Sequence, residues 1–397
     1  MNSDLDVNIF LPHDNLSGGI KAVSKIAKYS EYYGATINII VPKFPIIMGC
    51  DVLSKIGIGA IGSLIRRENE NDNTSKIDEW LDGSGNIVRI SNLQPQLHNF
   101  IKKSIPDADI HIATSWRTAY IVNNIADTIG EKYYFMQGYE IFPIWRNKKY
   151  WNMIAQQYPT QDASVQMANF SPTKFRDRVY KGYVDKSYKL DLDIIVTSQW
   201  EKRILAQLGI CSTQKVALGV ESNFSQTDDI RDNNELVITG IYRNSPAKGD
   251  RELLASFKKI NKIHNNVQLV LFGPKKFEGV PGFVDYYENP TDTLISSLLT
   301  NSDIFIFPSW VEGFGLPPLE AMKCGCVIIS TDVGAIREYA PENVVNFVPR
   351  NNSKAIVKAI ESYKQCDDLQ KYKFEAKAAA EQYTWKKTAS KFLNILS

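Results

Sequence analysis

Short segments that are apolar at nearly every position recur along the chain and alternate with longer segments of helical periodicity. Continuously apolar strands, unlike alternating ones, are typical of parallel sheets that helices cover on both faces. The alternation runs once through the first half of the chain and restarts in the second half. The predicted strands of the two series begin at Val7, Ile37, Ala108 and Lys132, and then at Asp193, Leu236, Val267, Asp303 and Cys326. The pattern therefore predicts an α/β protein with two doubly wound domains.

The restart of the pattern also predicts the domain limits. At about 150 residues per domain, a chain of 397 residues suits two or three domains. We place the boundary near Tyr188–Leu192, which gives a first domain over residues 1–190 and a second over 191–383. The final helix, within residues 384–397, has apolar residues spaced to dock on another surface. Because open parallel sheets bind ligands beyond the carboxyl ends of their strands, we expect the site in the cleft between the domains.

The composition excludes several classes of protein. The 46 basic and 44 acidic residues give a formal charge of only +2, which offers no reason to expect nucleic acid. The five cysteines form neither a paired framework nor a CxxC metal site, as in proteins of a reducing compartment. We find no secretory leader, and no apolar run reaches the length of about 18 residues that a spanning helix needs, so we expect a cytoplasmic protein.

One glycine-rich segment, Phe44 to Ile65, leaves the relation to a membrane open. Asp51 and Lys55 interrupt its apolar character, which favours a helix or loop packed on the first domain. The alternative is a segment that touches a lipid-linked acceptor or the inner face of the cell membrane, with the protein in peripheral association.

The segment Ser309–Glu320 combines two glutamates with a Gly/Pro-rich turn, after a predicted strand and before a helix that we expect to begin near Pro318. A helix N-terminus presents unpaired N–H groups that suit phosphates or sugar hydroxyls. Gly313 and Gly315 in this segment let a ligand approach the backbone closely. Glu320, expected on the first turn of the helix, and Glu312, at the strand end, can each accept hydrogen bonds from a pair of vicinal hydroxyls. By this pattern alone, a nucleotide-sugar site and a capped helix with two solvated glutamates are equally open.

The longer stretch Phe307–Ala340, with its Glu-x7-Glu pattern and the closing TDVGAIREYA, resembles the hallmark segment of glycosyltransferase family 4. Three other segments resemble further parts of that family and occur in the right order. They are the glycine-rich loop Ser17–Gly19, the turn Ala217–Glu221 and the Arg-x4-Lys-Gly segment Arg243–Gly249. The resemblance covers most of the C-terminal half and is thin across residues 42–190, where an acceptor would bind.

The resemblance implies a GT-B fold, in which two Rossmann-like domains face each other and the final helix packs back on the first domain. It implies retaining transfer of a hexosyl or deoxyhexosyl group from a nucleotide diphosphate sugar to a saccharide or lipid-linked saccharide, without a cofactor. Glu320 would bind the ribose hydroxyls, and Glu312 would be catalytic, holding the transferred sugar and steadying its developing positive charge. The donor-binding residues implied are Gly18, Gly19, Arg243, Lys248, Gly273, Phe314, Gly315, Leu316 and Glu320.

The first domain departs from the family at one functional position. Many members carry a histidine near the transferred sugar, but the matching positions here are Thr114 and Gln137, which makes Gln137 the second candidate catalytic residue. Tyr139, Glu140 and Trp145 follow in a dense polar–aromatic cluster. Aromatic faces stack on sugars, so these three residues are candidates for acceptor contacts; packing within the first domain is the other interpretation.

Two further patterns would indicate other chemistry. Gly57–Gly62 satisfies GxGxxG, but it stands well beyond the nearest predicted strand instead of directly after it, which disfavours a dinucleotide turn. Three Asp-x-Asp triplets stand at the starts of predicted strands, away from the carboxyl ends where a nucleotide and its metal would bind. We therefore expect no catalytic metal from Asp4/Asp6, Asp107/Asp109 or Asp191/Asp193.

Three other functions stay open at this point: a phosphorylase-like or sugar-phosphate synthase enzyme on the same fold, a nicotinamide-dependent oxidoreductase, and a non-catalytic module that binds nucleotide sugars. The presence of both glutamates and both basic residues argues against the last. No carboxylate is clearly placed as a nucleophile, which favours a same-face mechanism over a covalent intermediate. The family resemblance also suggests assembly of a bacterial surface polysaccharide, such as an O-antigen or capsule, on a lipid carrier.

Overall fold

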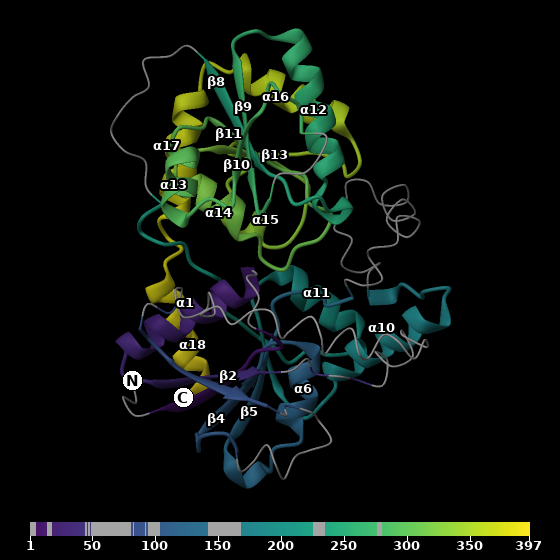
Figure 1. Cartoon of the computed structure of the whole chain (residues 1–397), viewed down its shortest axis with the longest axis vertical. Helices are drawn as coiled ribbons and strands as arrows, with labels where there is room; N and C mark the ends of the chain where they lie inside the picture. Colours follow the sequence, from purple (N-terminus) through teal and green to yellow (C-terminus); the bar gives the residue numbers. More distant parts are fainter. Residues whose placement is uncertain are drawn as a thin grey trace.

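The computed structural model describes residues 5–13, 18–43, 46, 48, 81, 83–91, 93, 104–141, 168–224, 235–275 and 280–397. Two parallel sheets, each covered by helices, form two α/β domains stacked along the long axis of the molecule (Figure 1). The predicted fold class is confirmed. Among the described residues, no helix combines the length and apolarity that a bilayer span requires.

The N-terminal sheet has seven strands in the order β3-β2-β1-β4-β5-β6-β7, and every neighbouring pair is parallel. The strands are β1 Asp6–Phe10, β2 Thr36–Pro42, β3 Asn86–Ile90, β4 Ile110–Ala113, β5 Glu131–Phe135, β6 Asp193–Val196 and β7 Gln214–Lys215. Its described helices are α1 Gly18–Tyr32, α6 Trp116–Asn123, η1 Asp127–Ile129, α10 Phe175–Ser187 and α11 Gln199–Gln207. Capping boxes at Ser115 and Ser198 fix where α6 and α11 begin.

The domain boundary differs from the predicted one. The strand that begins at Asp193 was expected to open the second domain, but β6 pairs with β5 and β7 pairs with β6, so both belong to the first sheet. The chain therefore leaves the N-terminal domain after Lys215 rather than near residue 190. A buried strand has the same apolar character in either sheet. The sequence pattern therefore predicted the strand at Asp193 but not the sheet to which it belongs.

The C-terminal sheet has six parallel strands in the order β10-β9-β8-β11-β12-β13. Two of its inner strands, β11 and β12, are buried at every position, as continuous apolar runs predict. The strands are β8 Leu236–Ile241, β9 Val267–Gly273, β10 Asp285–Glu288, β11 Ile304–Phe307, β12 Val327–Ser330 and β13 Val345–Phe347. The helices of this half are η2 Pro246–Lys248, α12 Asp250–Ile263, α13 Asp292–Thr300, α14 Leu316–Lys323, α15 Ile336–Tyr339, α16 Ser353–Lys364 and α17 Leu369–Ala380.

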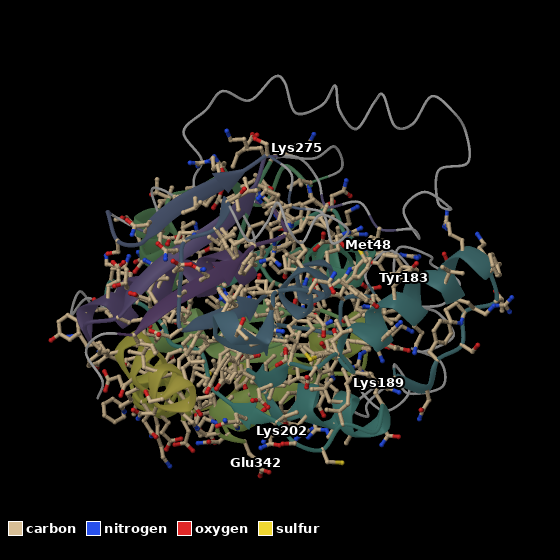
Figure 2. The ribbon with its side chains drawn as sticks, turned by 90° about the horizontal axis from the view of Figure 1, so that it is seen from below. Met48, Tyr183, Lys189, Lys202, Lys275 and Glu342 are labelled. Atoms are coloured by element: carbon tan, nitrogen blue, oxygen red, sulfur yellow. The ribbon has the colours of Figure 1, made fainter. Side chains whose placement is uncertain are left out.

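The last helix, α18 Trp385–Leu396, returns to the N-terminal domain and lies beside α1 (Figure 1). Its apolar face is buried, and Phe392 meets Phe135 of β5 edge to face with ring centroids 5.5 Å apart. Seen from below, side chains fill the space between the ribbons of the lower domain, and the exposed Lys275 and Glu342 lie at opposite edges of the view (Figure 2). The chain thus passes between the domains twice, before β8 and before α18.

Several sequence predictions fall outside the described residues. They concern the Gly57–Gly62 run, most of the Phe44–Ile65 segment, the first Asp of the triplet Asp4/Asp6, and Trp145.

Candidate active site

Loops from both domains meet where the two sheets face each other. Gly313, in the loop after β11, lies against the Gln137–Gly138 backbone that follows β5: a Cβ on Gly313 would be 2.0 Å from the Gln137 carbonyl oxygen. A Cβ on Gly138, at φ 152, would be 3.8 Å from the Gly313 Cα, so the two glycines face each other across the contact. The carboxyl ends of β5 and β11 therefore form one interdomain contact, at the place where doubly wound sheets bind ligands.

The loop that carries Glu312 is held rigidly. Gly315 takes a left-handed conformation at φ 90 and precedes α14, and its carbonyl accepts a hydrogen bond of 2.7 Å from the Tyr339 hydroxyl. The Phe314 carbonyl accepts from the Ala335 N–H at 2.9 Å. These contacts tie the loop of Glu312 to the C-terminal end of the segment that resembles the family hallmark, Phe307 to Ala340.

The helix after this loop begins earlier than predicted. α14 starts at Leu316 rather than near Pro318, so Glu320 lies in its second turn and not in its first. Proline is tolerated anywhere in the first turn of a helix, because the N–H groups of that turn have no partner within the helix. Pro317 and Pro318 were therefore equally acceptable helix starts by sequence alone.

Lys248 and Glu312, predicted to contact the diphosphate and the sugar, lie in direct contact. Lys248 Nζ is 2.6 Å from Glu312 Oε1, and the Ser309 hydroxyl donates to the same oxygen at 2.7 Å. Both charged side chains are mostly buried. A cation and a carboxylate thus lie side by side, next to the contact that Gly313 makes with the N-terminal domain.

Asp250 orders the loop of Arg243, a role that the sequence reading missed. Asp250 Oδ2 accepts hydrogen bonds from the N–H groups of Arg243 at 3.0 Å and Ser245 at 2.7 Å. Burial raises the pKa of Asp250 to about 6, although these two N–H groups oppose the shift. Its position directly after the Arg-x4-Lys-Gly segment, at the first residue of a helix, was the available signal, since acidic side chains are favoured there.

The loop of Arg243 also packs directly against the loop of Glu312. Gly249 has φ 70, and a Cβ on it would stand 2.1 Å from the Pro308 carbonyl oxygen. The Trp310 N–H also donates to the Ala247 carbonyl at 2.9 Å. The basic loop after β8 and the acidic loop after β11 are therefore one unit.

Glu320 is paired with a residue of the other domain. Lys21 of α1 places its Nζ 3.1 Å from Glu320 Oε1 and 3.0 Å from Asp292 Oδ2. Lys21 lies two residues after Gly19 in α1, which Gly18 and Gly19 open, and a Cβ on Gly18 would meet none of the described residues within 4 Å. The N-terminus of α1 thus lies next to a charged contact with the C-terminal domain.

Gln137 faces the start of α1. A Cβ on Gly19 would be 3.3 Å from Gln137 Oε1, and this buried oxygen has no hydrogen-bond partner in the part of the chain that the structure describes. Thr114, the other position where the family histidine was sought, is buried at the end of β4 and donates to the Phe10 carbonyl at 2.7 Å. The structure therefore leaves Gln137, and not Thr114, with an unused polar group beside the cleft.

Glu201, which the sequence reading also missed, stands at the same contact. It is fully buried at the start of α11; Oε2 accepts from the Thr197 N–H at 2.6 Å and the Thr197 hydroxyl at 2.9 Å. Oε1 lies 2.9 Å from where a Cβ on Gly313 would be, and it has no partner among the described residues. Burial raises the pKa of Glu201 to about 8.

Gly273 ends β9 next to β10. A Cβ there would stand 2.0 Å from the Tyr242 carbonyl oxygen and 2.7 Å from the Tyr286 hydroxyl, so the tight packing admits only glycine. The Tyr286 hydroxyl donates to the Lys275 carbonyl at 2.6 Å. β8, β9 and β10 therefore pack closely around Gly273, a residue that the family resemblance implies in donor binding.

The acceptor role suggested for Tyr139 is not supported. Its ring is fully buried, and its hydroxyl donates to Asp185 Oδ1 at 2.5 Å. Glu140 is half-buried and accepts from the Trp116 N–H at 2.5 Å and the Tyr134 hydroxyl at 3.1 Å. Both side chains make contacts within the N-terminal domain, as in the packing interpretation given with the sequence. A short aromatic-rich stretch has the same composition whether it packs a domain or binds a sugar.

Possible metal ligands do not gather at the cleft in the described part of the chain. No group of three or more His, Cys, Asp or Glu side chains there has the spacing to hold an ion. Asp109 instead accepts from the Asp6 N–H at 3.0 Å, at the amino ends of β1 and β4.

The second half of the chain is similar in sequence to known glycosyltransferases. Residues 224–381 match the sequence profile of the family described as Glycosyl transferases group 1. Sucrose synthase 6 of Arabidopsis thaliana is 26% identical over 202 residues, which are 49% of this chain and 21% of the plant protein. CapM of Staphylococcus aureus, a capsular polysaccharide biosynthesis glycosyltransferase, is 33% identical over 139 residues, 32% of this chain and 37% of CapM. The match thus spans only about a fifth of the length of the sucrose synthase.

Solved structures resemble the whole chain. Sucrose-phosphate synthase from Thermosynechococcus elongatus has a TM-score of 0.70 at 14% identity over 98% of both chains. HepE of Anabaena, in complex with UDP-glucose, has a TM-score of 0.64 at 15% identity over 99% of both chains. At such identities the likeness establishes the fold, which is GT-B. Residues 224–381 thus resemble that family, within a chain of GT-B fold.

Proposed function

We propose that the protein is a retaining glycosyltransferase of family 4, which moves a sugar from a nucleotide diphosphate sugar to a saccharide or lipid-linked saccharide. The Lys248–Glu312 pair, 2.6 Å apart at the interdomain contact, is the observation that carries the proposal. It joins the two segments that the sequence resemblance assigned separately to the diphosphate and to the sugar.

The proposed mechanism assigns a role to each charged group. As the bond between the sugar and the diphosphate breaks, Lys248 and Arg243 stabilise the charge of the departing diphosphate. The Gly18–Gly19 backbone at the start of α1 supplies further donors. Glu312 stabilises the positive charge that develops on the sugar, and Gln137 contributes its unused amide oxygen from the opposite domain.

The same contacts favour a same-face reaction. Glu312 Oε1 already accepts from Lys248 and Ser309, which weakens the carboxylate as a nucleophile and suits a purely electrostatic role. The departing phosphate would then accept the proton of the acceptor hydroxyl, while that hydroxyl oxygen bonds to the anomeric carbon on the face the phosphate leaves. Anomeric configuration is retained.

The relatives suggest the biological setting. CapM is named for capsular polysaccharide biosynthesis, and a serotype-specific mannosyltransferase, WbdA of Escherichia coli, is 31% identical over 102 residues. HepE is solved with UDP-glucose. We propose that this protein, too, uses a nucleotide sugar to build a bacterial surface polysaccharide, in the cytoplasm or at the inner face of the cell membrane, and without a metal ion.

A second candidate is a synthase that uses fructose or a sugar phosphate as acceptor. The similarity to sucrose synthase and the likeness to sucrose-phosphate synthase favour it specifically. Product formation from fructose or fructose 6-phosphate in place of a saccharide acceptor would select this alternative.

The test begins with thermal shifts against UDP-, GDP- and dTDP-sugars. Affinity for the nucleoside diphosphate should fall by about tenfold or more in Glu320→Ala and Arg243→Ala, since each loses a charge-assisted contact. Glu312→Gln should retain nucleotide affinity but lose at least about a hundredfold in turnover. Undiminished turnover in Glu312→Gln, or inversion at the anomeric carbon seen by NMR of the product, would refute the proposal.

A further inference from the structure

One face of α1 is charged and docks on the C-terminal half of the chain. Lys21, Lys25 and Tyr29 stand at i, i+4 and i+8, so they share a face of the helix. Lys25 Nζ is 2.5 Å from Glu221 Oε1, and the Tyr29 hydroxyl is 3.3 Å from Glu221 Oε2. α1 lies on the side of the lower domain that faces α13 and α14 (Figure 1). This face therefore fixes α1 against two regions: Lys21 meets the predicted donor site, and Lys25 meets the segment that connects the domains.

The contact of Lys21 is well buried. The side chains of Lys21 and Glu320 are 13% and 14% exposed, and Nζ lies 5.6 Å from the centroid of the Phe224 ring. Burial by itself lowers the pKa of Lys21, but the carboxylates of Glu320 and Asp292 outweigh it and raise the pKa above its ordinary value. Lys21 therefore stays charged at every physiological pH.

A carboxylate in this position needs its cation. Glu320 is as buried as Lys21, and a buried charge that loses its partner bears an uncompensated desolvation cost. Lys21 contacts one oxygen of Glu320, Oε1, so the other oxygen remains the one that can accept from a ligand. The N-terminal domain thus orients a side chain that belongs to the C-terminal domain.

We propose that Lys21 is a positioning residue for the nucleotide: it holds Glu320 so that the carboxylate can accept hydrogen bonds from the ribose hydroxyls. The inference rests on the proposed function, in which Glu320 binds the ribose. Because Lys21 belongs to α1, the ribose contact is complete only while α1 is docked on the C-terminal half. Affinity for the donor is thereby linked to the interdomain contact.

Lys25 offers a matched control. It lies one turn further along the same face, makes an ion pair of similar burial (12% and 15% exposed), and contacts Glu221 instead of Glu320. Lys25→Met thus removes a charged interdomain contact of α1 without touching the predicted ribose site.

The experiment measures the affinities of UDP and GDP, each with its 2′-deoxy counterpart, for Lys21→Met, Lys21→Arg, Lys25→Met and Glu320→Ala. We expect Lys21→Met to weaken the better-binding ribonucleotide by about tenfold, as the loss of one charge-assisted contact does. The 2′-deoxynucleotide, which lacks one hydroxyl for Glu320 to bind, should be affected clearly less. Lys21→Arg should recover most of the affinity, and Lys25→Met should resemble the unaltered protein.

Turnover separates positioning from a general structural effect. In Lys21→Met the KM for the donor should rise, with kcat at saturating donor unchanged within about twofold. Equal losses for ribo- and deoxyribonucleotide, a loss confined to kcat, or unchanged affinity would overturn the inference. If Glu320→Ala weakens the nucleotide while Lys21→Met does not, only the inference fails; if neither variant affects any nucleotide, the proposed donor site fails with it.

Discussion

Only glycine fits at position 313, because the Gln137 carbonyl and the Glu201 carboxylate of the other domain lie close to its Cα. A Cβ would stand 2.0 Å from the Gln137 carbonyl oxygen and 2.9 Å from Glu201 Oε1, closer than side-chain atoms approach such groups. We therefore predict that Gly313→Ala pushes the domains apart at Glu312 and lowers turnover by at least about tenfold. Steady-state kinetics checks this. Gly182→Ala on α10 is the control, because a Cβ there would meet none of the described residues within 4 Å, and equal turnover in both variants would contradict the prediction.

Glu201 makes stability depend on pH. Burial raises the pKa of Glu201 to about 8 from an ordinary 4.5, so the folded state holds this proton more tightly than the unfolded chain does. The free energy of unfolding should therefore fall as the pH rises from about 4.5 towards 8. Asp250, with a pKa raised to about 6, and Glu140, raised to about 7, act in the same direction.

Glu201→Gln isolates the share of Glu201 in that slope. Glutamine keeps an acceptor for the Thr197 groups and resembles the protonated acid, so the variant should lose less stability than the unaltered protein between pH 5 and pH 9. Urea unfolding at several pH values measures the two slopes. Coincident slopes would show that Glu201 has the same pKa in both states.

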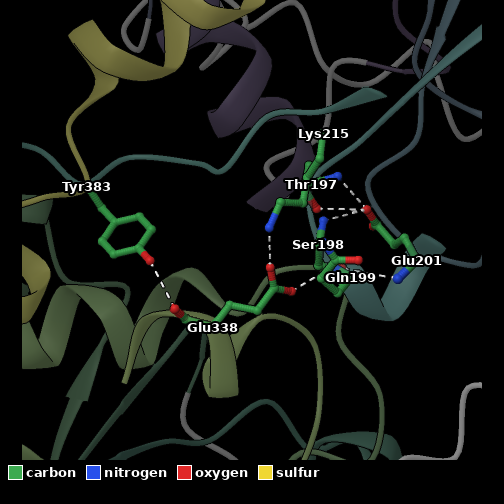
Figure 3. A network of polar contacts seen from close by, with 7 residues as sticks. All are labelled: Thr197, Ser198, Gln199, Glu201, Lys215, Glu338 and Tyr383. Carbon is green, nitrogen blue, oxygen red and sulfur yellow. Dashed lines mark hydrogen bonds and ion pairs between the residues drawn. The ribbon is translucent and has the colours of Figure 1, made fainter. Parts of the chain in front are cut away.

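At the scale of elements, the short helix α15 of the C-terminal domain meets α11 of the N-terminal domain. Glu338 of α15 accepts from the Gln199 N–H at 2.6 Å and from Lys215 Nζ at 2.5 Å, and the Tyr383 hydroxyl donates to the Glu338 carbonyl (Figure 3). A carboxylate at the first turn of α11 is favourable both for its unpaired N–H groups and for the helix dipole. This contact holds the domains together on the side of α11.

We predict that Glu338→Ala weakens the contact between the domains by about 1 kcal/mol or more, because it removes an ion pair and a helix cap together. Small-angle scattering should show a larger radius of gyration without ligand, and Lys215→Met should show part of the same change. Lys323→Met is the control, since its pair with Glu381 lies within the C-terminal half. An unchanged radius of gyration in Glu338→Ala would contradict the role of this contact.

At the scale of the whole molecule, the two segments that connect the domains cross in contact. A Cβ on Gly219 would stand 2.3 Å from the Thr384 carbonyl carbon, and the Val220 N–H donates to the Tyr383 carbonyl at 3.1 Å. The Thr388 hydroxyl, in the first turns of α18, donates to the Ala217 carbonyl at 2.9 Å. The return of α18 to the N-terminal domain therefore depends on a close approach of two backbones far apart in the sequence.

We predict that Gly219→Ala destabilises the protein by about 1–3 kcal/mol, the usual cost of overpacking. Gly282→Ala, whose Cβ would meet nothing within 4 Å in the described part of the chain, should change stability by less than about 0.5 kcal/mol. Thermal unfolding of the two variants provides the comparison. Similar melting temperatures would mean that the crossing can relax around the added methyl group.

The sequence by itself determined the features that are local in the chain. Continuous apolar runs encode burial on both faces, so they predicted strands such as β11 and β12 and the two parallel sheets. The loop of Glu312 and the basic loop of Lys248 were also identified, because glycines, prolines and charges at fixed spacing reflect backbone geometry within a few residues. These signals need no knowledge of how the domains meet.

Only the tertiary structure decided which distant groups meet. Lys21 and Glu320 are 299 positions apart, and their contact depends on how α1 docks on the other domain. The same holds for Gly313 against Gln137, and for β6, whose sequence suits either sheet. The sequence pattern indicates whether a side chain is buried or charged. It does not indicate which residue that side chain contacts, because the packing of the whole chain decides the contact.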